Sequence, residues 1–373
     1  MALRELLATL RRDVTHVARR AVGRRPPPFT RRQRVGAETK VFEVREVRRE
    51  TPDAISIVLA RPDGAPIPFA AGQFFTLIVD LGGERLRRAY SASSSAVEDG
   101  TVSVTVKRVA GGRVSNHLND HLRAGARLEV LGPSGSFGPA ASEAPRHLVL
   151  VAGGSGITPI MSIVRTLLAA APQTRLTLVY GSRRVEDVIF RAALAELAGP
   201  RLAVRHVLAD PPPGWTEGAG MLDEEIATRE LAGLAGADGY YVCGPAPMMA
   251  AVRAALRGLG VGDDCIHEER FFSPIATRPA ASLGPQRVTV RLRDRERQFV
   301  VAPGQTVLEA GLAAGVAMPF SCTLGGCAAC KCRAVTGTVE LEEPNCLTPD
   351  ERAQGAVLAC IARPTSALVL ELP

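Results

Sequence analysis

Four cysteines near the C-terminal end constrain this 373-residue chain more than any other feature. They are Cys322, Cys327, Cys330 and Cys360, and the first three follow a C-x4-C-x2-C spacing with a long gap to the fourth. This is the plant-type spacing that arranges four thiolates around a 2Fe–2S cluster. Because such a cluster takes up and releases single electrons, the chain is predicted to transfer electrons.

A structural zinc site and a disulfide pair are the alternative interpretations of these cysteines. Zinc sites usually combine two C-x2-C arms, and the sequence has one such arm here. Disulfides are not expected, because the sequence shows no secretion signal. The 2Fe–2S cluster is therefore the favoured interpretation.

Three of the other cysteines are expected to be structural. Cys332 is predicted to be the next inward residue of a strand that leaves the loop, and Cys346 lies outside the ligand spacing. Cys265 has no motif and is expected to fill core. The run 355–360 is mostly apolar and is predicted to form a short buried strand that brings in the last ligand.

Length and composition predict a multidomain protein located in the cytoplasm. About two or three domains fit this length, and 46% hydrophobic with 22% charged residues is ordinary for a globular protein. No apolar run reaches the ~18 residues that cross a bilayer. Residues 1–36 hold ten arginines against two acidic residues, a net charge of +8 compared with +7 for the whole chain, so the rest sums to −1. Nucleic-acid binding is therefore not expected, and the basic charge belongs to an N-terminal extension.

The N-terminal extension has an amphipathic pattern. Leucines and valines recur at helical spacing between its arginines, and three prolines at 26–28 end the predicted helix. One interpretation is that residues 1–25 dock on an anionic membrane surface or an acidic partner. The alternative is a helix packed on a neighbouring domain, or a frayed tail.

Strand-like runs and turn residues divide the remainder of the chain. Short strands separated by Gly and Pro predict a small antiparallel barrel, and the following strands alternate with helices in a doubly wound α/β pattern. A segment rich in Pro, Ala and Ser is typical of a linker and precedes the cysteine-bearing domain. The predicted boundaries are 1–36 for the extension, 37–142 for the barrel, 143–273 for the α/β domain, 274–286 for the linker and 287–373 for the cluster domain.

A glycine-rich turn follows the first predicted strand of the α/β domain. Gly154 and Gly156 allow backbone amides to approach a pyrophosphate at the start of a helix, and Thr158 and Pro159 suit its first turn. The turn departs from the six-position Rossmann fingerprint, since residue 159 is not glycine. Its place between a buried strand and a helix still predicts a dinucleotide site.

The next strand ends at Ser182, Arg183 and Arg184. A site specific for NADH would place an acidic residue here to hold the ribose 2′-hydroxyl, whereas a hydroxyl and two guanidiniums suit a 2′-phosphate. NADPH is therefore predicted as the donor, with NADH as the alternative if these are ordinary solvated loop residues.

The barrel adds two stretches, Arg88-Ala89-Tyr90-Ser91 and the run from Lys107 to Ser115. Together with the sheet motifs, they resemble the ferredoxin–NADP reductase superfamily over about residues 38–373. The resemblance is closest to the subgroup with a C-terminal plant-type ferredoxin domain, such as the reductase components of phenylacetyl-CoA epoxidase, ketosteroid hydroxylase and acyl-CoA desaturase systems. It implies an antiparallel β-barrel flavin domain, an α/β doubly wound nucleotide domain and an α+β β-grasp ferredoxin domain.

The resemblance also implies roles for individual residues. Arg88 would hold the flavin pyrophosphate, Tyr90 would stack on the isoalloxazine, and Ser91 would lie near its N5 atom. The implied cofactor-binding set is completed by Lys107, Gly112 and Ser115 at the flavin and by Cys243, Gly244 and Pro245 at the nicotinamide. Tyr90, Ser91 and Cys243 are the candidate catalytic residues.

Further matches are less specific. Asn345, Thr348, Glu351 and Gly355 are similar to a run that precedes the last cysteine in the family. Phe271 and Phe272 follow the position where members place an aromatic residue beside the flavin. A related group with the same domain order uses FMN, but the Gly-Gly-Arg turn at 111–113 lacks that group's second Gly-Gly after the arginine, so FAD is predicted.

These observations predict a monomeric reductase that passes electrons from NADPH through FAD and a 2Fe–2S cluster to an oxygenase, hydroxylase or desaturase. One alternative is an NADH-dependent reductase that contains FMN. Another is a redox sensor whose cluster controls binding to a partner, although a sensor would not need nicotinamide and flavin motifs.

Overall fold

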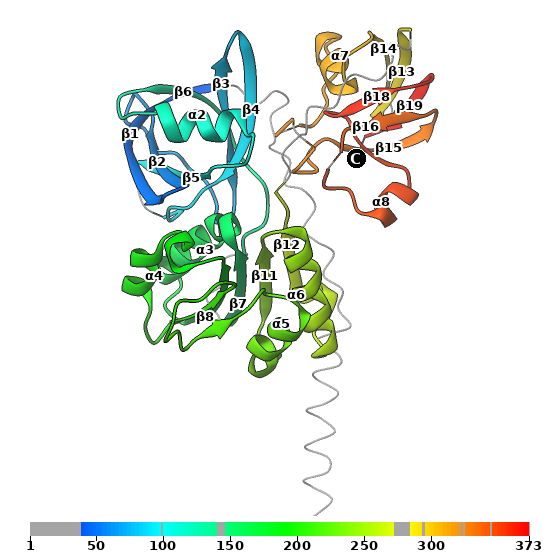
Figure 1. Ribbon diagram of the computed structural model, residues 1–373. Coiled ribbons are helices and arrows are strands. Elements are labelled where there is room, and N and C mark those ends of the chain that lie inside the picture. Colours follow the sequence, from blue (N-terminus) through cyan, green and yellow to red (C-terminus); the bar gives the residue numbers. More distant parts are fainter. Residues whose placement is uncertain are drawn as a thin grey trace, which may run out of the picture. The chain divides into compact units, whose positions relative to one another are not determined.

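The computed structural model describes residues 39–97, 100–139, 146–271, 284–292, 295–320, 322–323, 325–343 and 345–372. The predicted N-terminal amphipathic helix lies outside these residues, as do most of the predicted linker and Phe272. The described chain forms a β-barrel, an α/β domain and a smaller α+β domain (Figure 1). Within the described ranges, no helix is long and apolar enough to cross a membrane.

The first domain is an antiparallel sheet of six strands in the order β4-β3-β6-β1-β2-β5. Its two edge strands meet where Ala92, just after β4, bridges Val104 of β5, which closes the sheet into the predicted barrel. The interior is filled by alternate residues such as Ile55, Ile57 and Leu59 of β2. The elements are β1 Lys40–Thr51, β2 Ala54–Ala60, β3 Phe74–Leu81, β4 Glu84–Ser91, β5 Thr101–Lys107, α2 Arg113–His121 and β6 Arg127–Ser134.

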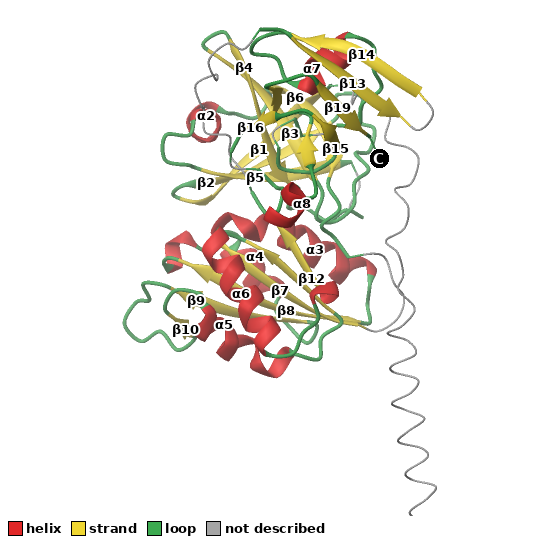
Figure 2. Ribbon diagram, turned by 90° about the vertical axis from the view of Figure 1, so that its right-hand side faces the viewer, coloured by secondary structure: helices red, strands yellow, loops and turns green. Residues whose placement is uncertain are grey.

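The second domain is a parallel sheet in the order β10-β9-β8-β7-β11-β12. The strand β7 shows why both faces are covered: Leu148, Leu150 and Ala152 pack with α3 and α4, whereas Val149 and Val151 pack with α5 and α6. Figure 2 shows the helices over the sheet. The elements are β7 Arg146–Gly153, α3 Ile157–Ala170, β8 Thr174–Ser182, α4 Arg191–Leu197, β9 Leu202–Leu208, β10 Gly218–Ala219, α5 Glu224–Leu231, β11 Gly239–Cys243, α6 Ala246–Gly258 and β12 Ile266–Glu269.

The third domain is a mixed five-stranded sheet, β14-β13-β19-β15-β17, with helix α7 packed into its core and a two-stranded β16–β18 ribbon. The helix starts at a capping box in which Thr306 and Glu309 satisfy each other's backbone amides. The elements are β13 Gln286–Leu292, β14 Arg295–Val301, α7 Val307–Ala313, β15 Lys331–Thr336, β16 Val339–Leu341, α8 Pro349–Ala353, β17 Ala356–Leu358, β18 Ala362–Pro364 and β19 Leu368–Glu371.

The predicted fold class is confirmed in all three domains, and the differences are local. Helix α3 begins at Ile157, two residues before the predicted proline, because a short 3-10 turn over Gly154–Gly156 leads into it. The buried strand predicted over 355–360 ends at Leu358, so Cys360 lies just beyond it. Cys332 is an inward, buried residue of β15, as predicted, and Cys265 is partly buried against the α/β core.

Candidate flavin, nucleotide and iron–sulfur sites

A cavity of about 460 Å³ opens on the barrel between the end of β4 and the start of α2. All six of the residues predicted to hold the flavin line it, and Thr158 of the nucleotide domain and Phe271 border it too. Its size falls in the range of ordinary cofactor sites. The lining residues from the predicted set are Arg88, Tyr90, Ser91, Lys107, Gly112 and Ser115.

The start of α2 is shaped to receive an anion. A Cβ atom at Gly112 would lie 2.5 Å from the Ser115 Oγ atom, so only glycine allows the backbone to fold tightly here. The Ser115 hydroxyl accepts a hydrogen bond from the Val109 amide at 3.2 Å, which fixes the turn. No acidic residue occupies the first turn of α2, and the helix dipole favours a negative group at that end.

The basic residues around the cavity differ in their partners. Lys107 faces Asp53 at 3.6 Å, and Arg108 and Arg113 form ion pairs with carboxylates. The Arg88 guanidinium donates a hydrogen bond to the Arg87 carbonyl at 2.7 Å, and it forms no ion pair with the described residues. Arg88 therefore fits the predicted role of binding a pyrophosphate.

Tyr90 and Ser91 lie at the end of β4, where both line the cavity. Burial raises the pKa of the Tyr90 phenol, which keeps the ring neutral and suited to stacking. Ser91 is buried, and its Oγ atom donates a hydrogen bond to a carboxyl oxygen of Glu269 at 3.3 Å. The sequence analysis missed Glu269, which ends β12 in the next domain.

Glu269 is an acid held in its neutral form near neutral pH. Burial raises the pKa of its carboxyl to about 8, and the Ser91 hydrogen bond offsets this only in part. A neutral carboxyl can donate a proton through the Ser91 hydroxyl, and an ionised one can take it back. The pair can therefore move a proton at the edge of the flavin cavity.

The backbone of the predicted nucleotide turn adopts a geometry that requires glycine. Gly154 adopts a φ of +52°, with open space where a Cβ would project, so its amide side is free to face a ligand. A Cβ at Gly156 would lie 2.1 Å from the Cys243 carbonyl oxygen, so the turn packs directly on β11. Thr158 and Pro159 are buried in the first turn of α3. The arrangement leaves room for a pyrophosphate at the helix start.

Cys243, Gly244 and Pro245 lie at the carboxyl end of β11, beside this turn. The Cys243 thiol is fully buried, and burial raises its pKa well above the usual value. A Cβ at Gly244 would approach the Gly153 backbone to 3.0 Å, which explains the glycine. Their backbone therefore shapes the predicted nicotinamide end of the site, and burial keeps the thiol neutral.

The predicted nucleotide residues at the end of β8 differ in exposure. Ser182 is buried, and its hydroxyl is covered, whereas Arg183 and Arg184 are exposed in the following loop. Tyr180, buried in the same strand, donates a hydrogen bond to the Gly154 carbonyl at 3.0 Å. This bond ties the glycine-rich turn to β8 and was not predicted from the sequence.

The four predicted cluster ligands converge as two pairs. The Cys322 amide donates a hydrogen bond to the Cys327 sulfur at 3.4 Å, and the Cys330 and Cys360 side chains are hydrogen-bonded to each other. A hydrogen bond with the Cys322 thiol, together with burial, raises the pKa of Cys327, while the Cys360 thiol lowers the pKa of Cys330. The eight cysteines of the chain, all in described segments, form no disulfides.

This pairing fits a two-iron cluster better than a single metal ion. In the parts of the chain that are described, no three His, Cys, Asp or Glu side chains are grouped closely enough to hold one ion. A 2Fe–2S cluster instead takes two protein ligands on each iron. The loop is also shaped to wrap a cluster: Gly325 has a φ of +72°, and a Cβ there would lie 2.7 Å from Ile361.

Residues 345–355, which precede Cys360, form hydrogen bonds that stabilise the cysteine-bearing loop. The buried Asn345 accepts a hydrogen bond from the Leu347 amide, and Thr348 and Glu351 form a capping box at the start of α8. Gly355 adopts a φ of +81° at the turn into β17. Cys346 is partly buried, and its amide bonds the Gly325 carbonyl at 2.9 Å. These residues position the loop.

A small cavity joins the three domains near the flavin site. It is lined by Phe74 and Ser91 of the barrel, by Glu269 and Phe271 at the end of the α/β domain, and by Cys322 and Gly326 of the cluster loop. Residues of the flavin cavity, the Glu269 carboxyl and one predicted cluster ligand thus border the same space. Electron transfer between the two cofactors needs such proximity.

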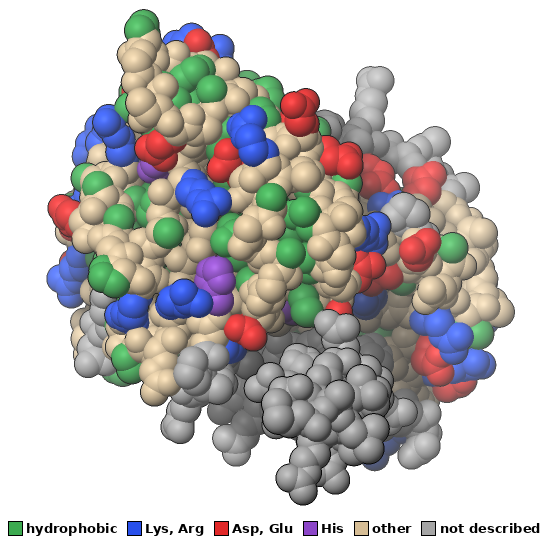
Figure 3. All heavy atoms as spheres, turned by 90° about the horizontal axis from the view of Figure 1, so that it is seen from below, with side chains coloured by type: hydrophobic (Ala, Val, Ile, Leu, Met, Phe, Trp, Pro, Cys, Tyr) green, Lys and Arg blue, Asp and Glu red, His purple; other side chains and the backbone are tan. Residues whose placement is uncertain are grey.

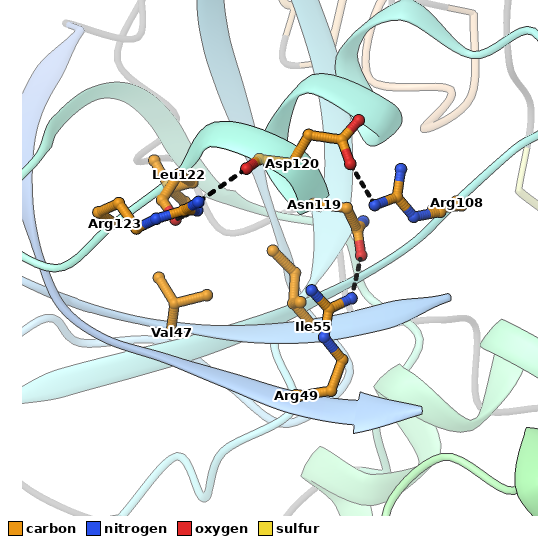
Figure 4. Close-up of a pocket in the computed structure, with 8 residues that line it drawn as sticks. All are labelled: Val47, Arg49, Ile55, Arg108, Asn119, Asp120, Leu122 and Arg123. Carbon is orange, nitrogen blue, oxygen red and sulfur yellow. Dashed lines mark hydrogen bonds and ion pairs between the residues drawn. The ribbon is translucent and has the colours of Figure 1, made fainter. Parts of the chain in front are cut away.

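In another hollow on the barrel, the basic side chains are already engaged by other protein groups. Figure 4 shows a hollow of about 420 Å³ beside the C-terminal end of α2, where the guanidiniums already have partners: Arg49 bonds Asn119, Arg108 pairs with Asp120, and Arg123 bonds backbone carbonyls. On the face shown in Figure 3, basic and acidic side chains of the described residues are interspersed. That face shows no large patch of one sign.

A flavin cavity, a nucleotide turn and a four-cysteine loop on one chain define a nicotinamide-dependent flavin and iron–sulfur oxidoreductase. Comparison with protein families agrees with this class. Residues 41–138 match the oxidoreductase FAD-binding domain, residues 150–254 the oxidoreductase NAD-binding domain, and residues 290–365 the 2Fe–2S iron–sulfur cluster binding domain.

The chain belongs to the family of oxygenase reductase components that combine these three domains. It is 38% identical to one of the subunits of 1,2-phenylacetyl-CoA epoxidase from Escherichia coli, over 88% of this chain and 96% of that protein. It is 37% identical to the ferredoxin reductase component of 3-ketosteroid-9-alpha-monooxygenase from Mycolicibacterium smegmatis, over 89% of this chain and 96% of that protein. The solved phthalate dioxygenase reductase covers 90% of this chain and 98% of its own, with 27% identity and a TM-score of 0.60.

Proposed function

We propose that this reductase takes hydride from NADPH, passes it to FAD, and delivers single electrons through its 2Fe–2S cluster to an oxygenase, hydroxylase or desaturase. The bound flavin and cluster supply the change from two-electron to one-electron transfer. The observation that carries the proposal is the cavity that Ser91, Glu269 and Cys322 share, because it brings the flavin edge and the cluster loop together.

The chain's own residues then have the following proposed roles. Arg88, Gly112 and Ser115 bind the flavin pyrophosphate, with Lys107 beside them, and Tyr90 orients the ring. Gly154 and Gly156 receive the nucleotide pyrophosphate, with Thr158 and Pro159 starting the helix. Cys243, Gly244 and Pro245 position the nicotinamide, and Ser91 with Glu269 holds or moves the proton.

We propose FAD and not FMN because of the extent of the cavity on the barrel. The cavity extends from the Tyr90 end along the turn at 109–113 to the start of α2, which gives space and positive charge for a pyrophosphate. FMN has one phosphate and no adenosine, so it would fill less of this space. Extraction of the bound flavin and chromatography against both standards separates the two outcomes.

The partner and location are proposed at a coarser level. Relatives are named as an epoxidase subunit and as monooxygenase reductase components, which supports an oxygenase-type acceptor. We further propose a cytoplasmic monomer in which residues 1–25 provide peripheral contact with an anionic membrane. Deletion of residues 1–25 should abolish binding to anionic liposomes and leave dye reduction intact.

An anaerobic absorbance titration with NADPH, and with NADH in parallel, tests the main proposal. Bleaching of both the flavin and the cluster bands by NADPH is the expected result. Failure of NADPH to bleach the flavin would reject the proposed donor. A bleached flavin with an oxidised cluster would reject the internal route between them.

A further inference from the structure

Asp210 lies beside the loop that is proposed to bind the adenosine ribose. It follows β9, the strand next to β8 in the parallel sheet. The Ala209 amide donates to the Ser182 carbonyl at 3.0 Å, and the Asp210 amide donates to the Arg183 carbonyl at 2.8 Å. The strand pairing therefore continues past the strand ends and fixes Asp210 against the loop.

The Asp210 side chain engages one of the two arginines expected to bind a 2′-phosphate. The Arg184 Nε atom donates to an Asp210 carboxylate oxygen at 2.8 Å, and a Glu186 carboxylate oxygen lies 3.9 Å from another nitrogen of the same guanidinium. Two carboxylates thus surround the guanidinium. Both Arg184 and Asp210 are about half exposed, so this ion pair can rearrange at little cost.

We infer that Asp210 is a specificity-determining residue that weakens binding of the 2′-phosphorylated dinucleotide relative to the unphosphorylated one. The inference rests on the proposed function, in which this edge of the sheet holds the adenosine ribose. It concerns which dinucleotide is preferred, and it names a residue that acts against the sequence-based expectation of NADPH.

The physical reason is the charge at the 2′ position. A phosphate monoester carries about −1.5 to −2 charges at pH 7, so the Asp210 carboxylate repels it and competes with it for Arg184. A ribose hydroxyl is uncharged and can donate a hydrogen bond to a carboxylate, as acidic residues do in NADH sites. Asp210 therefore opposes the preference that the exposed Arg183 and Arg184 would otherwise create.

The test compares Asp210→Asn with a matched control in the same domain. Asp263 forms a similar exposed pair with Arg257, two hydrogen bonds of 2.8 Å, but it precedes β12 and so lies at the opposite, amino end of the sheet. Asp263→Asn therefore removes the same charge from the domain, away from the nucleotide site.

Flavin reduction in the full-length protein is measured with NADPH and NADH at low ionic strength. For Asp210→Asn, we expect the ratio of kcat/KM for NADPH to that for NADH to rise about tenfold, mainly through a lower KM for NADPH. The control should keep the wild-type ratio. A ratio that stays within about twofold of the wild type, or that rises equally in the control, would overturn the inference.

A binding measurement separates this inference from the proposed function. Calorimetric titration of the full-length protein with adenosine 2′,5′-bisphosphate and with 5′-AMP needs no catalytic turnover. Tighter binding of the bisphosphate to Asp210→Asn, with no tighter binding of 5′-AMP, supports the inference even if the flavin route fails. Unchanged bisphosphate binding rejects it even if NADPH reduces the flavin.

Discussion

The nucleotide turn and the cluster loop hold their ligands by opposite means. At the predicted nucleotide turn the backbone itself is expected to approach the ligand, and its glycines allow tight packing; a Cβ at Gly156 would collide with the Cys243 carbonyl. At the cluster loop the essential groups are four side-chain sulfurs, arranged in two pairs. The nucleotide turn thus depends on positions without side chains, whereas the cluster loop depends on the sulfur atoms that its side chains supply.

The largest effect is expected when a sulfur atom of the cluster loop is replaced. Cys330→Ser replaces a soft thiolate by a hydroxyl, so the cluster should be lost and electron delivery to a partner abolished. Flavin reduction by NADPH should persist. Iron and sulfide content, with visible absorbance, measures this. Cys346→Ser, in the same domain but outside the two pairs, should retain the cluster; its loss there would show that the effect is one of folding.

An added side chain should be almost as damaging at the nucleotide turn. Gly156→Val places a Cβ 2.1 Å from the Cys243 carbonyl oxygen, so the turn must move. A displacement of about 1 Å can cost about 100-fold in rate, and we expect that loss in kcat/KM for NADPH. Gly258→Ala, where a Cβ meets nothing within 4 Å, is the control. Wild-type kinetics in Gly156→Val would refute the packing argument.

A smaller effect is expected at the carboxyl that links the domains. Burial raises the pKa of Glu269 to about 8, so its neutral, proton-donating form disappears as the pH rises through 8. The rate of flavin reduction should fall by up to about tenfold between pH 7 and pH 9 in the wild type. Glu269→Gln should give a flat profile there. The exposed Asp264→Asn should keep the wild-type profile, and an unchanged slope in Glu269→Gln would exclude this carboxyl.

The smallest effect should follow loss of one hydrogen bond. Tyr180→Phe removes the bond from the phenol to the Gly154 carbonyl at 3.0 Å and fills the same space. One such bond contributes about 0.5–1.5 kcal/mol, so the KM for NADPH should rise about two- to tenfold with kcat unchanged. A fall in kcat alone would show that Tyr180 acts on the reaction and not on the turn.

The same comparison explains what the sequence could predict. The cysteine spacing and the glycine-rich turn are short local patterns that a sequence reveals directly. In the structure the four cysteines lie in two pairs, and the turn lies between β7 and α3. Glu269 escaped prediction because its partner Ser91 is 178 residues away, and no local pattern marks it. Asp210 and Tyr180 were missed for a related reason: their partners lie on a neighbouring loop or turn that only the sheet order brings close.

The cavity shared by the barrel, the α/β domain and the cluster loop also has a kinetic consequence. Because the residues that border it belong to one chain, the internal electron step is unimolecular. Its observed rate should stay constant when the protein is diluted, whereas the rate of delivery to a separate acceptor should scale with the acceptor concentration. The order of the internal reaction is thus set by covalent connection, and only the last step responds to how much partner the cell contains.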